Sequence, residues 1–157
     1  MITTSDFKQL QNCACFNVRK TSRMITQLFD HALKPSGIKI TQFTLLGVLA
    51  NAGEMAINEL ANSLGMDRST LTRGIVRLEA AGLVKSREGD DARQRFVKLT
   101  TKGIKKINDT IPYWKKAQDA MEKELGENFP RFLDTMEKRW KQKKLLAKEQ
   151  QLVWLMD

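Results

Sequence analysis

Basic and hydroxyl side chains are concentrated in one short segment, MDRSTLTRGIVRLEAAG (66–82). Its apolar residues Leu71, Ile75 and Leu78 recur three and four positions apart, which predicts a helix with one buried stripe. The basic and hydroxyl side chains of the segment are Arg68, Ser69, Thr70, Thr72, Arg73 and Arg77. Arginine binds guanine edges and phosphates, and a threonine methyl contacts thymine. The polar side of this helix therefore predicts contact with double-stranded DNA, against the alternative of a solvated helix face.

The flanking residues predict how this helix is held. Asp67 is placed as its N-cap, and Gly82 ends it. EMAINELANSLG (54–65) predicts a shorter helix directly before it, and two helices at this spacing are typical of a helix-turn-helix. The β-prone runs LVKSRE (83–88) and QRFVKLT (94–100) then predict a hairpin, which in this position is a wing.

The tip of the predicted wing, GDDAR (89–93), is charged. We expect Arg93 to enter a narrow minor groove, where negative potential is concentrated. Asp91 would repel phosphate, so we expect it to orient a neighbouring arginine. The alternative is an ordinary charged hairpin tip of little energetic weight.

Composition excludes several classes of protein. The 157 residues contain 27 Lys plus Arg against 18 Asp plus Glu, a net charge of +9 that favours nucleic acid over membrane as partner. One His and two Cys give no metal cluster or disulfide framework, and no phosphate-binding loop or acid pair is seen, so we expect no catalytic residue, no metal and no cofactor. No apolar run approaches the roughly 20 residues of a membrane span, and no signal peptide is seen, which predicts a cytoplasmic protein.

Longer helices are predicted on both sides of the wing and helix-turn-helix. The first covers 5–34 after Thr4, and the second covers 42–51 with Thr41 as its cap. Thr100 is expected to cap a helix over 101–125, with Ile104, Ile107 and Ile111 facing inward, and a last helix covers 128–154. A first helix of about 30 residues is about 45 Å long, too long for a small globule to cover, which predicts a homodimer.

The expected fold is therefore mainly α with a small β-hairpin wing: a winged helix-turn-helix flanked by long dimerisation helices. The predicted division is 1–40 for the N-terminal dimerisation helix, 41–100 for the DNA-binding region and 101–157 for the C-terminal dimerisation helices, in one integrated domain. A winged helix used only to bind another protein is the rival function.

The segment from Leu60 to Gly103 resembles the core of the MarR family of winged-helix repressors. The resemblance rests on the pairs Leu60–Ala61, Thr72–Arg73, Gly82–Leu83 and Leu99–Thr100, on Asp91 and Arg93, and on the flanking residues Gln42, Phe43, Pro112 and Trp114. It implies an obligate homodimer on a pseudo-palindromic operator. It also implies a repressor that is released by a small phenolic or carboxylate ligand, or by oxidation.

The same resemblance implies an effector pocket between the dimerisation helices and the winged helix. There Arg19 and Arg23 would anchor a carboxylate, while Phe43 and Trp114 would form an apolar wall. The alternatives are salt bridges or DNA phosphate contacts for the arginines and ordinary core packing for the aromatic residues.

Two cysteines lie close together, Cys13 and Cys15. On a helix they would point about 200° apart, which disfavours a bond between them. Cys15 resembles the reactive cysteine of the organic-hydroperoxide-sensing branch of the family, although Arg19 and Phe29 stand where that branch has tyrosines. Thiol-based oxidant sensing through Cys15 is thus an alternative to ligand release, and plain packing is a second one.

Overall fold

The computed structural model describes residues 11–89, 94–126 and 128–149. It forms two units, one up to residue 117 and one from residue 118 onward, which are described separately. The first unit opens with α2 (Ala14–Ala32), a short 3-10 turn η1 (Lys34–Ser36) and α3 (Ile40–Ala52). Helix α6 (Thr101–Leu125) begins in the first unit and ends in the second, which also holds α7 (Asn128–Glu149).

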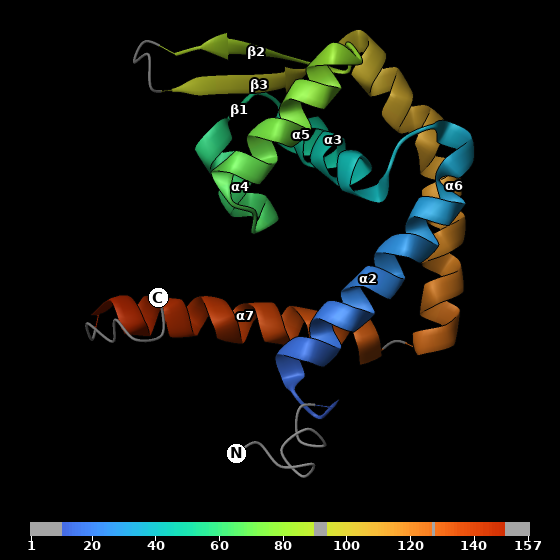
Figure 1. The fold of residues 1–157 in the computed structure, drawn as a ribbon, viewed down its shortest axis with the longest axis vertical. Helices are drawn as coiled ribbons and strands as arrows, with labels where there is room; N and C mark the ends of the chain where they lie inside the picture. Colours follow the sequence, from blue (N-terminus) through green and yellow to red (C-terminus); the bar gives the residue numbers. More distant parts are fainter. Residues whose placement is uncertain (1–10, 90–93, 127, 150–157) are drawn as a thin grey trace, which may run out of the picture. The chain divides into compact units, whose positions relative to one another are not determined.

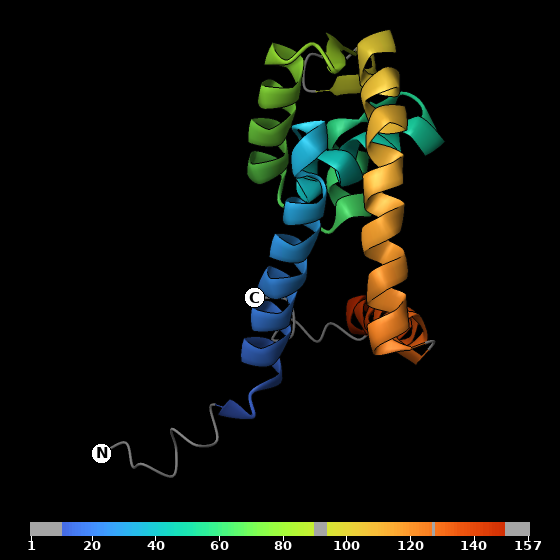
Figure 2. The same ribbon diagram turned by 90° about the vertical axis from the view of Figure 1, so that its right-hand side faces the viewer.

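The centre of the first unit is a winged helix (Figure 1). It contains β1 (Met55–Ala56), α4 (Ile57–Leu64), α5 (Arg68–Ala80), β2 (Val84–Glu88) and β3 (Arg95–Leu99). The sheet is antiparallel in the order β1-β3-β2. Helix α5 runs along one outer edge of this unit (Figure 2). The predicted fold, mainly helical with a small wing, is confirmed.

Strand β1 was not predicted from the sequence. It has two residues, and it pairs Met55 with Val97 and Ala56 with Phe96. The expected helix over 54–65 therefore begins only at Ile57. A strand this short shows no alternation of apolar and polar residues, so its only signal is the partner strand some forty residues further along the chain.

The start of α3 differs from the prediction that Thr41 caps it. The helix begins at Ile40 with Lys39 as its N-cap, and Thr41 lies inside it. Gln42 Oε1 accepts a hydrogen bond of 2.9 Å from the Lys39 N–H, and Asp30 Oδ1 accepts one of 2.8 Å from the Ile40 N–H. The amide of Gln42 and the carboxylate of Asp30 thus accept hydrogen bonds from the first N–H groups of the helix, the role that was expected of the Thr41 hydroxyl.

The first helix is shorter than predicted over the described residues. It begins at Ala14, and Cys13 precedes it with extended backbone angles, φ −61° and ψ 119°. The earlier part of the predicted span, residues 5–10, lies outside the described residues. Cys13 and Cys15 therefore do not share one helix, and the helical angle used to argue against a bond between them does not apply.

Packing agrees with the predicted stripes in the winged helix. Leu71, Ile75 and Leu78 of α5 are at most 1% exposed. Along α6, Ile107 is buried as expected, but Ile104 is 51% exposed, so its predicted inward orientation is wrong. Apolar side chains are also exposed on α2 and α7, where the largest are Phe16, Val18, Met24, Leu28, Phe132, Leu133 and Met136.

Candidate nucleic-acid interface

The first turn of α5 is organised by Asp67. Its Oδ1 accepts hydrogen bonds from the Thr70 N–H at 2.8 Å and from the Ser69 hydroxyl at 2.6 Å. The hydrogen bond from Ser69, followed by those from Thr70, holds the pKa of the Asp67 carboxyl well below its usual range. The predicted N-cap is confirmed, and the carboxylate keeps its charge while the turn stays closed.

The outer face of α5 carries the predicted DNA-contacting side chains. Arg68, Ser69, Arg73 and Arg77 are exposed, while Thr70 and Thr72 are half-buried at its sides. The Arg73 Nη2 donates to Thr70 Oγ1 at 3.2 Å, and the Thr72 hydroxyl donates to the Arg68 carbonyl at 2.7 Å. Ser69, Arg73 and Arg77 thus share the side of α5 opposite its buried stripe, Thr70 and Thr72 lie at the edges of that side, and Arg68 lies in the first turn nearer the stripe.

Val76 belongs to the same face and was missed in the sequence. It is 52% exposed, although it is apolar. At 100° per residue it lies between Ser69 and Thr72 around the axis, on the exposed side of the helix. Its position outside the stripe of Leu71, Ile75 and Leu78 was the available signal. An apolar side chain there is suited to contact with a thymine methyl.

A groove of about 320 Å³ lies between α3 and α5. Three of its lining residues are cations: Lys39 at the start of α3, and Arg73 and Arg77 on α5. The Lys39 ammonium is 3.2 Å from Asp30 Oδ2 and its side chain remains 68% exposed. The structure therefore adds Lys39 to the basic residues that the sequence indicated, because it places the start of α3 beside α5.

Ion pairs connect the wing to the rest of the winged helix. Arg95 on β3 donates to Glu79 at the end of α5, at 3.0 and 3.2 Å. Arg87 on β2 binds both carboxylate oxygens of Glu54, and its guanidinium lies 4.6 Å from the centroid of the Phe96 ring. Asp91 and Arg93, the predicted wing-tip residues, lie outside the described residues.

The C-terminal end of α5 is attached to the start of α6. Thr100 donates its hydroxyl to the Gly82 carbonyl at 2.7 Å and accepts the Gly103 N–H at 3.0 Å, which confirms it as the cap of α6. The Lys102 ammonium donates to the Ala81 carbonyl at 2.8 Å. A Cβ at Gly103 would overlap the Leu83 carbonyl oxygen, so only glycine allows this approach.

The aromatic residues of the predicted effector pocket meet. The Phe43 and Trp114 ring centroids are 6.0 Å apart, and both line a hollow of about 530 Å³ over the outer side of α3. Arg19 and Arg23 are exposed on α2 and do not belong to its lining. Cys15 is an exposed free thiol, and Cys13 is a half-buried one.

Two further kinds of site, a membrane span and a metal cluster, have geometric requirements that the described ranges do not meet. No helix there is long and apolar enough to cross a membrane. Within the same ranges, no three His, Cys, Asp or Glu side chains gather in a way that would hold a metal ion.

Comparison with known proteins gives a consistent picture. The sequence profile of the MarR family matches residues 36–94. The HTH-type transcriptional regulator FarR of Neisseria gonorrhoeae is 31% identical over 110 residues, which are 69% of this chain and 75% of that protein. YwoH of Bacillus subtilis, an uncharacterised HTH-type transcriptional regulator, is 33% identical over 92 residues, 59% of this chain and 67% of its own length.

A solved structure extends the similarity beyond the winged helix. The M. tuberculosis transcriptional regulator MosR, determined in complex with DNA, superposes with a TM-score of 0.76 at 32% identity. The match covers 85% of this chain and 98% of that one. With the helix-turn-helix, the wing and these relatives in agreement, the chain belongs to the MarR family of winged-helix transcriptional regulators.

Proposed function

We propose that this protein binds a pseudo-palindromic DNA operator as a homodimer and represses transcription until a small aromatic or carboxylate ligand releases it. The observation that carries the DNA-binding part is the outer face of α5. It presents Ser69, Arg73 and Arg77 to solvent, while the one acid of the helix, Glu79, pairs with Arg95. A basic and polar face on a helix whose other side is fully buried suits insertion into a major groove.

Each basic residue has a proposed role. Arg73 lies near the centre of the exposed face and reads a base edge, with Ser69, Thr70 and Thr72 as its polar neighbours. Arg68, Arg77 and Lys39 flank this centre and bind phosphates, which fix the register but carry no sequence information. Arg93 remains the proposed minor-groove contact of the wing, oriented by Asp91.

The homodimer is supported by the exposed apolar side chains of α2 and α7. Met24 and Val18 on α2 are 59% and 60% exposed, and Phe132 on α7 is 56% exposed. Apolar surface repeated along helices favours burial against a second subunit. Two copies of α5 would then enter successive major grooves about one helical turn apart.

The proposed effector site is the hollow beside Phe43 and Trp114. Its volume of about 530 Å³ lies within the range of small-molecule sites, and its two rings offer an apolar wall. Arg19 and Arg23 do not line this hollow, but they remain the proposed carboxylate anchors on α2. Alanine at either position should weaken release by a carboxylate effector while leaving DNA binding without effector unchanged.

Release of DNA by oxidation is the alternative, and the exposed thiol of Cys15 favours it. A hydroperoxide would transfer one oxygen atom to Cys15, forming a sulfenic acid and leaving an alcohol. Treatment with cumene hydroperoxide should then release operator DNA from the wild type but not from Cys15→Ser. Equal responses of the two proteins would exclude this route.

Replacing Arg73 tests the proposed reading of bases. Arg73→Ala should weaken operator binding by about 10- to 100-fold for each half-site, because both protomers of the dimer lose one bidentate base contact. Its affinity for random DNA should change little. Arg77→Ala is the matched control, and it should weaken both DNAs alike and lower the salt dependence by about two counterions, one for each protomer. Fluorescence anisotropy on both DNAs over a series of salt concentrations measures these effects.

Two outcomes would contradict the proposal. An equal loss for operator and random DNA in Arg73→Ala would exclude base reading by Arg73. Failure of the wild type to bind any DNA at low salt would instead favour a winged helix used for protein interaction.

A further inference from the structure

Val76 is an exposed apolar side chain on the polar side of α5. It is 52% exposed, whereas the other large apolar side chains of the helix are at most 1% exposed: Leu71, Ile75 and Leu78. The core of the winged helix therefore packs against the opposite side and does not include Val76. Helix propensity does not favour a valine here either, because β-branched residues form helices less readily than lysine, glutamate or arginine.

Two charged side chains that could cover Val76 are held by other partners. Arg73 and Glu79 lie three residues before and after it, a spacing at which side chains meet on a helix surface. The Arg73 Nη2 donates to Thr70 Oγ1 at 3.2 Å, and Thr70 lies on the far side of Arg73 from Val76 around the axis. Glu79 accepts from Arg95 on β3 at 3.0 and 3.2 Å. Both charged ends are thereby engaged, and the isopropyl group of Val76 remains exposed.

The two neighbours one turn away are short. Thr72 precedes Val76 by four residues, and Ala80 follows it by four. The Thr72 hydroxyl donates to the Arg68 carbonyl at 2.7 Å, and Ala80 is exposed with only a methyl group. Neither can cover the isopropyl group, so a partner that approaches this side of α5 meets it directly.

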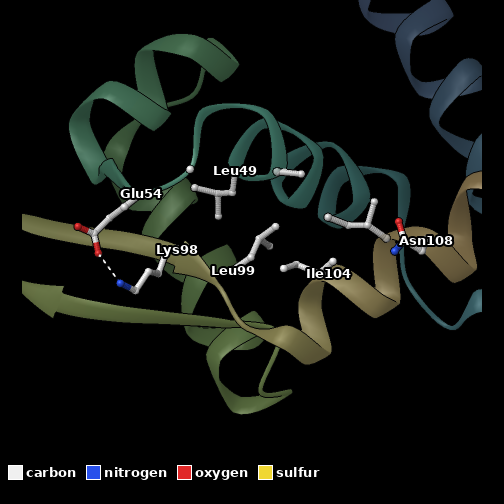
Figure 3. A pocket seen from close by; sticks show the side chains of 9 residues that line it. Leu49, Glu54, Lys98, Leu99, Ile104 and Asn108 are labelled. Atoms are coloured by element: carbon white, nitrogen blue, oxygen red, sulfur yellow. Dashed lines mark ion pairs between the residues drawn. The ribbon is translucent and has the colours of Figure 1, made fainter.

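Ile104 on α6 is an apolar side chain of similar exposure in different surroundings. It is 51% exposed, but it lines a hollow of about 380 Å³ together with Leu49 and Leu99 (Figure 3). Its neighbours in that hollow are thus apolar side chains of the same chain. The helix neighbours of Val76 are mostly polar or charged, so an apolar contact for it must come from outside the chain.

The charges around Val76 indicate the kind of partner. Arg77 directly follows it, Arg73 precedes it by three residues, and both line a groove with Lys39. Such a surface attracts a polyanion, and in the major groove of DNA the apolar group that a base edge presents is the C5-methyl of thymine. Because the χ1 angle of a helical valine is nearly fixed, its methyl groups would meet this group at little cost in conformational entropy.

We propose that Val76 is a specificity-determining residue that contacts the C5-methyl group of one thymine in each half-site. This inference rests on the proposed function, because Val76 meets a base only if α5 enters a major groove. It adds a preference that the arginines do not supply, since thymine and uracil differ only in this methyl group and offer the same hydrogen bonds. The same contact would favour 5-methylcytosine over cytosine at that position.

The test begins with duplexes that the full-length protein selects from a random pool. Each thymine of the selected half-site is then replaced by uracil, in both half-sites at once. At one thymine, this change should weaken wild-type binding by about fourfold for each half-site, the loss expected for one buried methyl group. Val76→Ala should bind the thymine and uracil duplexes alike at that position and keep its preferences elsewhere. Fluorescence anisotropy measures these affinities.

Two variants and a second base pair serve as controls. Val76→Ile keeps a branched apolar side chain and should retain the preference for thymine. Ile104→Ala removes apolar atoms of similar exposure outside α5 and should behave as wild type. With cytosine in place of the thymine, methylation at C5 should strengthen wild-type binding by a similar factor and leave Val76→Ala unaffected.

The outcomes separate this inference from the proposed function. If the pool yields no enriched sequence, the proposed operator binding fails, and the role of Val76 fails with it. If a half-site is enriched but none of its thymines responds to uracil, the operator binding stands and the contact with Val76 is wrong. A response to uracil that persists in Val76→Ala would assign the methyl group to another residue and would also overturn the proposal.

Discussion

Asp67 determines how α5 begins, because one carboxylate oxygen accepts from both Ser69 and Thr70. Because these donors bind the ionised carboxylate, the hydrogen bonds from Ser69 and Thr70 lower the pKa of Asp67. A group whose pKa is lower in the folded state stabilises the fold above its unfolded pKa. That stabilisation is lost as the pH falls through the folded-state value.

We therefore expect Asp67→Ala to lower the melting temperature at neutral pH. The difference from wild type should shrink as the pH falls below about 4, where the unfolded carboxyl takes up a proton. Asp67→Asn is the control: it keeps an oxygen acceptor for the N-cap but cannot titrate, so it should be the less destabilised variant at neutral pH. Calorimetric melting over a pH series measures this, and a pH-independent difference for the alanine variant would contradict it.

At the level of single residues, the sequence predicted which polar side chains of α5 are exposed better than it predicted their surroundings. The stripe of Leu71, Ile75 and Leu78 fixes which way α5 faces, so the exposure of Arg73 followed directly. The exposure of Val76 follows from the same helical geometry, but the prediction from sequence applied that geometry only to polar residues. The role of Lys39 could not be predicted from the sequence, because its position beside α5 depends on how two separate helices pack.

At the level of elements, the joint between α5, β2 and α6 depends on close backbone contact. Gly103 lets α6 begin directly against the Leu83 carbonyl, while Thr100 and Lys102 hold the carbonyls of Gly82 and Ala81. The end of the recognition helix is thereby tied to the start of a proposed dimerisation helix.

Gly103→Ala should destabilise the protein by about 1–3 kcal/mol or more, because the new methyl meets a backbone atom that cannot move alone. Gly47→Ala is the matched control: Gly47 also lies within a helix, but its Cβ would meet nothing within 4 Å. That change should be neutral or stabilising by up to about 1 kcal/mol. Urea unfolding measures the free energy of unfolding of both variants. Equal values would show that the close approach at Gly103 does not contribute to stability.

Element boundaries were predictable where the signal is local. Asp67 and Thr100 each bond to an N–H three residues on, so their type and position predict the caps. The start of α3 is different, because Asp30 reaches it from another helix. β1 likewise exists only through its pairing with β3, and no local pattern predicts a two-residue strand.

At the level of the whole molecule, exposed apolar side chains on α2 and α7 are the basis for the proposed dimer. Met24→Glu should weaken dimerisation by about a hundredfold or more, since twofold symmetry repeats the cost of each buried charge. Asn58→Glu adds the same charge to an exposed position on α4 and should leave the dimer intact. Sedimentation velocity over a range of concentrations measures the change, and an unaltered dimer in Met24→Glu would place the interface elsewhere.

The hydrogen bonding inside α5 also limits which bases a dimer can select. The hydroxyl protons of Ser69 and Thr72 are already donated, to Asp67 and to the Arg68 carbonyl. While those bonds last, both oxygens can only accept. In the major groove they would complement the exocyclic amino groups of adenine and cytosine and would oppose the oxygens of guanine and thymine. Arg73, a pure donor, has the reverse preference, so each half-site would be read by groups of opposite hydrogen-bond polarity.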